Sequence, residues 1–305
     1  MNSALFGDLP LVTSETELED VKAANPELDP YFVASGCILE RRKLFEVLWP
    51  AFKPYADPHF LSDLRKHFHQ RTWEMYLGNV LVNKGSVISS SPEGPDFVVN
   101  DGLYLECIAP TKGNLNNKDA VPEIHYTRFG EKPCAFPLPE REILLRITQA
   151  IKEKADKHYN KWRKKSWFRP DLPYVIAINI GDLEHPENPK MPYVVKALFG
   201  VSHMYVEFVQ GTNYSSYGWQ FRNEIQRGSG SSVAVDCFMS SCLSHVSGVL
   251  FSNDTVLNHL VYTDRECLFV NNPFTENLIP LDFVSYFNGW EARREGENII
   301  LKKML

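Results

Sequence analysis

The sequence predicts a mixed α/β fold, and three features of the chain support this prediction. Two long helices are expected at about residues 58–84 and 140–163. A β-hairpin is expected between them, at 95–109, where two apolar runs of alternating pattern flank a turn-like Asn-Asp-Gly. The continuous apolar run YVIAINI, at 174–180, is typical of a central strand covered on both faces. This order of elements indicates helices packed on both faces of a mixed sheet.

The first helix has recognisable signals at both ends. Asp57 can cap its N-terminus, and Pro58 suits the first helical position, where the N–H that proline lacks is not needed. Lys84 lies in the last turn, and Gly85 can end the helix. These signals place one helix over about 58–84.

Three parts of the chain are expected. Residues 1–57 form an N-terminal helical extension, in which 37–52 has an amphipathic pattern. Residues 281–305 form a C-terminal tail, a short helix or strand pair, packed on the central domain. Residues 110–139, rich in Pro, Gly and Asn, are typical of a long loop. Residues 58–280 form the α/β domain, with further strand candidates at HMYVEFVQ (203–210), VSGVLFS (246–252) and ECLFVNN (266–272).

Composition and charge narrow the classes of function. The 305 residues carry a formal net charge of −6, so a polyanionic partner would need a local basic patch. No apolar run approaches the roughly 18 residues that span a bilayer, and the N-terminus lacks a secretory signal pattern. These two features predict a protein without membrane contact. The six cysteines contain no CxxC pair, which favours reduced thiols in a cytoplasmic protein over a zinc site.

The hairpin contains two acids, Asp96 and Glu106, within runs that are otherwise apolar. With a three-residue Asn-Asp-Gly turn, closed by Gly102 in the left-handed region, Val99 faces Leu103 and Asp96 faces Glu106. A two-residue turn would place apolar residues opposite carboxylates. The apolar pattern therefore predicts the register in which the two acids are cross-strand neighbours.

Two carboxylates in such a register need compensation. Cross-strand neighbours have Cβ atoms about 5 Å apart, so like charges there repel, and partial burial strengthens the repulsion. A divalent cation would relieve it, since Mg²⁺ is usually held by one or two carboxylates together with water and substrate phosphate. The alternatives are a solvated hairpin edge, or an arginine or lysine partner for each acid.

Glu74 is a further unusual acid. It is the only charged side chain in TWEMYLGNVLVN (72–83), a segment that is apolar around most of a helical circumference. Such a helix is buried, and a buried glutamate is rare unless it is paired or ligating. Glu74 therefore either pairs with Arg71, three residues earlier, or contributes to a functional site.

The second helix carries a local excess of positive charge. Arg146, Gln149 and Lys152 are spaced three apart and share a face. From 152 to 169, aromatic residues are interleaved among basic ones, a composition that suits phosphate contact and base stacking. The alternative is a solvated helix end. The candidate nucleic-acid-binding residues are Arg71, Gln149, Lys152, Lys161, Arg163, Lys164 and Lys165.

The order of these features resembles the PD-(D/E)XK nuclease superfamily, the restriction-endonuclease-like proteins. The residues that carry the resemblance are Glu74 in a helix, Pro95-Asp96 before the hairpin, Glu106 at a strand end, and Gln149 with Lys152 in the following helix. The element order is similar to that family's αβββαβ core and covers about residues 58–181. The resemblance implies a restriction-endonuclease-like mixed sheet flanked by helices, and a metal-dependent nuclease with DNA as the expected substrate.

The resemblance also implies a metal site. Asp96 and Glu106 would bind a catalytic Mg²⁺ (or Mn²⁺), with Glu74 as an additional ligand and the main-chain carbonyl of Cys107 as another. The metal would lower the pKa of a bound water and stabilise the negative charge that develops in phosphodiester hydrolysis.

One position departs from the family pattern. The motif E-x-K requires a lysine two residues after Glu106, where this chain has Ile108. Lys112 in the following loop, or Lys152 in the helix, could supply the missing cation, and Lys112 is the candidate catalytic lysine. If neither does, the alternative is a catalytically inactive nuclease-fold protein that acts in binding or assembly.

A third alternative is a cysteine-dependent hydrolase. Cys237 and His245 lie eight residues apart in a run that is otherwise typical of a protein core. A nucleophilic cysteine needs an adjacent base, so this pair supports the alternative only weakly.

Overall fold

A computed structural model describes most of the chain. The described residues are 5–90, 93–124, 137–187, 190–208, 210–211, 215–261 and 267–304. The loop expected at 110–139 lies partly outside these ranges. Its described portions contain no helix or strand.

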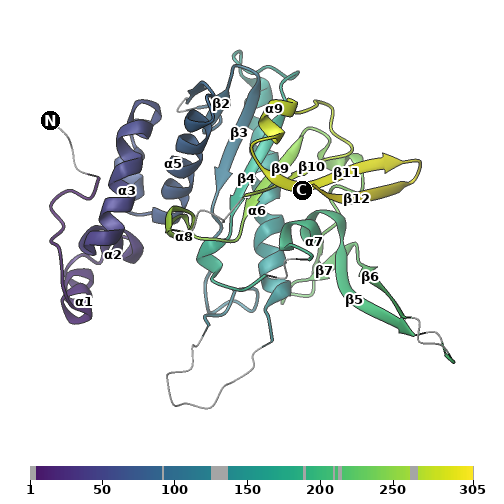
Figure 1. Cartoon of the computed structure of the whole chain (residues 1–305), viewed down its shortest axis with the longest axis horizontal. Helices are drawn as coiled ribbons and strands as arrows, with labels where there is room; N and C mark the ends of the chain where they lie inside the picture. Colours follow the sequence, from purple (N-terminus) through teal and green to yellow (C-terminus); the bar gives the residue numbers. More distant parts are fainter. Residues whose placement is uncertain are drawn as a thin grey trace.

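The strands of the main sheet come from both halves of the chain (Figure 1). In sheet order they are β1 (Ile88–Ser89), β2 (Phe97–Val99), β3 (Leu103–Ile108), β4 (Tyr174–Asn179), β9 (Gly248–Ser252), β10 (Leu268–Asn271), β11 (Asn288–Glu295) and β12 (Asn298–Met304). The central strands β3, β4 and β9 are parallel, and β10 pairs parallel to β11, whereas the other neighbours are antiparallel. The prediction of a mixed sheet is therefore confirmed, and β4 is buried at every position, as its apolar run predicts.

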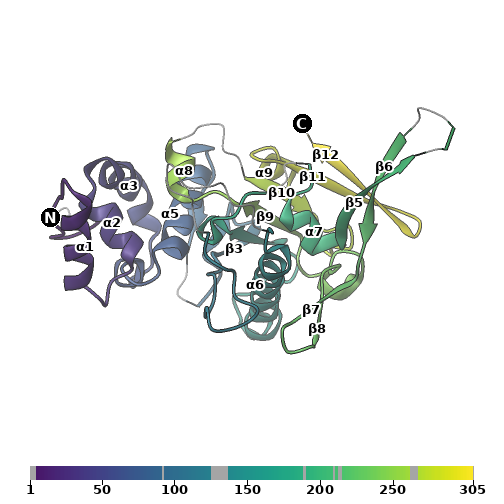
Figure 2. The same cartoon turned by 90° about the horizontal axis from the view of Figure 1, so that it is seen from below.

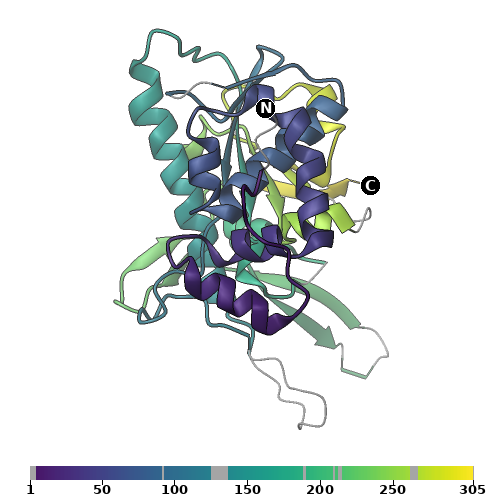
Figure 3. The ribbon, with the colours of Figure 1, turned by 90° about the vertical axis from the view of Figure 1, so that its left-hand side faces the viewer.

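Helices cover both faces of this sheet. One face packs against α5 (Phe68–Asn83) and α8 (Val256–Val261), together with the N-terminal helices α2 (Pro30–Cys37) and α3 (Leu39–Phe52). Helix α1 (Glu15–Ala24) has no buried residue and lies against α2. The other face packs against α6 (Glu140–Lys161) and α7 (Tyr193–Phe199). Figure 2 shows β3 between α5 and α6, and Figure 3 shows the N-terminal helices in front of the sheet.

The helix predicted over 58–84 is interrupted, so that prediction is wrong in its first part. The chain forms α4 (Phe60–Leu64), leaves the helix at 65–67, and begins α5 at Phe68. At the break, Asp29 of the N-terminal extension donates its N–H to the carbonyl of Arg65 at 2.7 Å, and its carboxylate accepts from the N–H of Phe68 at 3.1 Å. A tertiary contact therefore uses backbone groups that a continuous helix would have paired internally.

The hairpin has the predicted register. Val99 pairs with Leu103 and Phe97 with Leu105, which places Asp96 opposite Glu106. The conformation of the turn differs from the prediction, because Asn100 and Asp101 take positive φ, whereas Gly102 does not. Asn and Asp tolerate the left-handed region better than other non-glycine residues, so the turn forms without a glycine there.

The last part of the chain extends the sheet rather than only packing on it. After the short helix α9 (Leu281–Val284), β11 pairs with β10, and β12 then forms the sheet edge. The strand predicted at 203–210 corresponds to β5 (Val201–Phe208), which pairs with β6 (Ser215–Phe221) in a separate two-stranded ribbon. Figure 1 shows this ribbon projecting away from the main sheet. A second small ribbon joins β7 (Glu224–Gln226) and β8 (Ser232–Ala234).

We expect Gly78→Ala to destabilise the protein, although alanine normally favours a helix interior by about 1 kcal/mol. A Cβ atom at Gly78 in α5 would lie 2.6 Å from the ring of Phe52. Overpacking of this kind typically costs about 1–3 kcal/mol, which urea denaturation would measure. Val47→Ala, at a side chain of α3 that is 75% exposed, is the control and should change stability little. A stabilised Gly78→Ala variant would contradict this packing.

Candidate active site

The predicted acids lie beside a cleft of about 690 Å³. Its walls come from α5, from α6, from the chain after β3, and from the start of α2. The side chains that line it include Asp96, Arg71, Gln70, Arg146, Gln149 and Lys154. Segments far apart in sequence therefore meet at the end of β3.

Glu106 is the most buried charge of this site, with no exposed surface. Its Oε1 accepts hydrogen bonds from the ammonium groups of Lys154 at 2.8 Å and Lys157 at 2.6 Å, both from α6. Its Oε2 accepts from the main-chain N–H of Asp96 at 3.2 Å. Two lysines therefore supply the compensation that the sequence requires for Glu106, which is one of the alternatives to a metal ion.

Asp96 is half-buried at the start of β2. Its Oδ2 accepts a hydrogen bond from the main-chain N–H of Cys107 at 2.7 Å. Burial and the negative charge of Glu106 raise the pKa of Asp96 to about 7, although Lys154 opposes the shift. The carboxylate of Asp96 therefore gains and loses a proton near neutral pH.

Glu74 is buried in α5 and binds Arg71, whose Nη1 lies 2.7 Å from its Oε2. This confirms the predicted pair at a spacing of three residues. Burial and the charge of Asp96 nevertheless raise the pKa of Glu74 to about 8, against the opposing effect of Arg71. Arg71 also binds Asp57 at 3.0 Å and Asp63 at 2.6 Å, so its charge is already neutralised.

Gln70 holds the backbone at the end of β3. Its Nε2 donates to the carbonyl of Cys107 at 3.0 Å, and its Oε1 accepts from the N–H of Ala109 at 2.7 Å. The carbonyl that the family resemblance implies as a metal ligand is therefore hydrogen-bonded to a side chain. Gln70 is not among the predicted site residues, although it lies four residues before Glu74 on the same helix face.

The lysines of the site differ from those predicted. Lys112 lies 2.7 Å from Glu184 in an ion pair, and Lys152 is exposed on α6. Lys154 and Lys157 approach the acids instead. A sequence signal existed, because Ala150, Lys154 and Lys157 follow one another at helical spacing beside the apolar stripe of α6.

Apart from Lys152, which is exposed and does not line the cleft, the predicted nucleic-acid-binding residues fall into two groups. Gln149 and Arg71 line the cleft. The second group is exposed at the end of α6 and just after it, outside the cleft, and contains Lys161, Arg163, Lys164 and Lys165. Lys165 forms an ion pair with Glu93 at 2.8 Å.

A divalent cation would need oxygen ligands from the acids of this site. Among the described residues, no cluster of three or more His, Cys, Asp or Glu side chains is arranged to hold a metal. Asp96 and Glu74 nevertheless provide carboxylate oxygens, and the charge of Asp96 is, after burial, a cause of the raised pKa of Glu74. Mg²⁺ usually needs only one or two protein carboxylates, so this pair fits such an ion. Glu106 does not contribute while Lys154 and Lys157 hold it.

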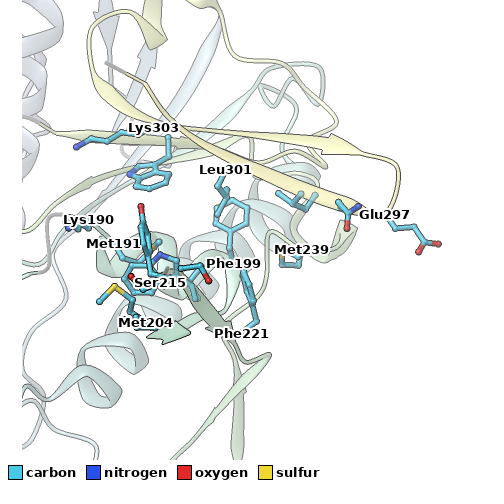
Figure 4. A pocket seen from close by; sticks show the side chains of 18 residues that line it. Lys190, Met191, Phe199, Met204, Ser215, Phe221, Met239, Glu297, Leu301 and Lys303 are labelled. Carbon is cyan, nitrogen blue, oxygen red and sulfur yellow. The ribbon is translucent and has the colours of Figure 1, made fainter. Parts of the chain in front are cut away.

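A larger groove of about 1020 Å³ lies between the β5–β6 ribbon and the β11–β12 hairpin. Figure 4 shows that it is lined by apolar side chains such as Phe199, Phe221 and Leu301.

The thiol hydrolase alternative gains no support from the structure, because burial and then the neighbouring Cys242 raise the pKa of the Cys237 thiol. A nucleophilic cysteine requires the opposite shift.

No protein-family model matches the chain, and comparison with curated proteins and with solved structures gives no significant match. In the part of the chain that the structure describes, every helix is too short or too polar to cross a bilayer.

We expect Glu106→Gln to destabilise the protein by about 3 kcal/mol or more, because it leaves the ammonium of Lys154 partly buried without a carboxylate. Urea denaturation at pH 7 measures the effect. The double variant Glu106→Gln with Lys154→Met removes the unpaired charge and should recover part of the loss. Equal stability of wild type and Glu106→Gln would rule out this ion pair as a structural requirement.

Asp96→Asn should stabilise the metal-free protein at pH 8. The pKa of Asp96 is about 7 in the folded chain, against 3.8 as its ordinary value. The Asp96 carboxyl group therefore makes its full favourable contribution to the free energy of unfolding below pH 3.8, and this contribution is lost as the pH rises through 7. We expect the free energy of unfolding of Asp96→Asn to exceed that of wild type by about 1–3 kcal/mol at pH 8. Urea titrations with EDTA should show this difference growing between pH 4 and pH 8. Asp101→Asn, exposed in the same hairpin, is the control, and a gain independent of pH would contradict the assignment.

Proposed function

We propose that this protein is a metal-dependent nuclease that hydrolyses phosphodiester bonds, with DNA as the preferred substrate. The element order supports the proposal, because α5, β1, β2, β3, α6 and β4 follow one another as the αβββαβ core of restriction-endonuclease-like proteins would require. In the main sheet, β3 and β4 are parallel neighbours, connected through α6.

The observation that carries the proposal is the meeting of an acid pair and an ammonium group beside an open cleft. Asp96 faces Glu106 across the hairpin, and Lys154 binds Glu106 from α6. Lys154 thus offers the cation that Ile108 cannot. A lysine in this position can stabilise negative charge that develops during hydrolysis.

A mechanism follows from the roles of these side chains. Asp96 and Glu74 would hold Mg²⁺, which when bound lowers the pKa of a water molecule and stabilises phosphate charge. Lys154 holds the Glu106 carboxylate and adds positive charge beside the reacting group. Gln70 fixes the backbone on either side of Ile108, and Asp96 can exchange a proton near neutral pH.

The second candidate function is a catalytically inactive nuclease-fold protein that binds nucleic acid. The observation that favours it is the saturation of Glu106, whose two carboxylate oxygens already accept hydrogen bonds from Lys154, Lys157 and Asp96. The carbonyl of Cys107 is likewise bonded by Gln70. Binding without cleavage would then be the function of the cleft.

Cleavage assays decide between the two. Single- and double-stranded DNA and RNA should be tested with Mg²⁺ and with Mn²⁺, using wild type, Asp96→Asn and Lys154→Met. We expect metal-dependent cleavage of DNA that falls about 100-fold or more in both variants, as when one transition-state contact is removed. Lys112→Met, whose ammonium binds Glu184, is the matched control and should retain activity.

The other outcomes are equally informative. Cleavage that survives in both Asp96→Asn and Lys154→Met would assign the activity to another site or to a contaminant. Binding of DNA in EDTA with no cleavage under any metal condition would favour the inactive protein.

A further inference from the structure

Most cationic side chains of the cleft are already neutralised by carboxylates of the protein. Lys66 also lines the cleft, but it is exposed, so solvent hydrates its charge. The pairs among the described lining residues are Arg71 with Asp57, Asp63 and Glu74, Lys154 and Lys157 with Glu106, and His69 with Asp182. Cations that are paired in this way attract a bound phosphate less strongly than an unpaired cation does.

Arg146 is the exception among the half-buried cations. Within the described residues, its guanidinium has no carboxylate within ion-pair distance, and its buried Nε has no hydrogen-bond partner. Its Nη2 donates one long hydrogen bond, 3.4 Å, to the main-chain carbonyl of Asp119. The carboxylate of Asp119 is used elsewhere, by Arg141 at 2.8 Å and by the N–H of Gly228 at 2.7 Å.

The guanidinium is held in place by the loop after β3. Gly113 lies so close that a Cβ atom there would be 1.9 Å from Nη2 of Arg146, and its φ of +88° also favours glycine. The loop backbone therefore packs directly on the guanidinium. This contact limits the orientations of the Arg146 side chain without neutralising it.

A half-buried cation without an anion is unfavourable, and a bound anion would relieve that cost. Burial lowers the pKa of Arg146, with Arg227 adding to the shift and Asp119 opposing it. A guanidinium presents a planar set of donors that matches the oxygens of a phosphate, often with two parallel hydrogen bonds. Gln149, one turn further along α6, is exposed in the same cleft and can donate to a neighbouring oxygen.

We propose that Arg146 forms the phosphate-binding site of the cleft and binds a phosphodiester group of the nucleic acid. This inference rests on the proposed function and identifies how the substrate would be held. Arg146 and Asp96 line the same cleft, so one strand bound there can contact both residues. Arg146 acts in binding, whereas Asp96 and Lys154 act in hydrolysis.

The test is equilibrium binding in EDTA, which separates binding from catalysis. Fluorescence anisotropy of labelled single- and double-stranded DNA oligonucleotides is measured for wild type, Arg146→Gln and Arg146→Lys. We expect Arg146→Gln to weaken binding about 10-fold or more, as for a lost charge-assisted hydrogen bond, and to reduce the slope of log K against log salt by about 1. Arg146→Lys should recover part of the affinity and of the slope.

Lys161→Gln is the matched control, since it removes one exposed positive charge of α6 outside the cleft. Thermal melts of each variant verify folding, and Arg146→Lys provides the result if Arg146→Gln does not fold. The inference is overturned if wild type binds no oligonucleotide, if inorganic phosphate alone is bound, or if the Arg146 variants lose no more affinity than Lys161→Gln. Arg146-dependent binding without cleavage would overturn the proposed function alone.

Discussion

A carboxylate that is completely buried at the end of a central strand must be neutralised, and this requirement determines how α6 lies on the sheet. Glu106 accepts from both Lys154 and Lys157, which follow one another at helical spacing. These two bonds, together with the apolar stripe of α6 in the core, fix the rotation of α6 about its axis. The same rotation places Arg146 and Gln149 along the cleft. Structure and candidate site thus depend on one ion-pair cluster.

Local patterns were sufficient to predict much of the fold. The hairpin register followed from alternation, because only one pairing keeps Val99, Leu103 and their neighbours on the buried face. The central strand β4 followed from its unbroken apolar run. For the site, the burial of Glu74, its pair with Arg71 and the opposition of Asp96 to Glu106 were all predictable.

Tertiary contacts account for what could not be predicted. The break at 65–67 depends on Asp29, which no local pattern connects with α5. The role of Lys154 depends on the rotation of α6 against β3, and Lys152, two residues earlier, faces solvent instead. The sequence indicated a short helix or strand pair at 281–305, but the place of β11 and β12 in the main sheet depends on pairing with β10. These contacts join residues that are far apart in the sequence, so no local pattern could predict them.

The long crossover between β3 and β4 has a consequence for the order in which the protein folds. The β2–β3 hairpin closes a short loop, whereas α6 returns to β3 only through a crossover that begins after Ile108 and ends at Tyr174. Short loops close at lower entropic cost than long ones. We therefore expect Asp96 and Glu106 to meet before Lys154 and Lys157 arrive, so that the early hairpin would carry an uncompensated repulsion. Docking of α6 would remove this repulsion and would couple the late, long-range step of folding to the completion of the site.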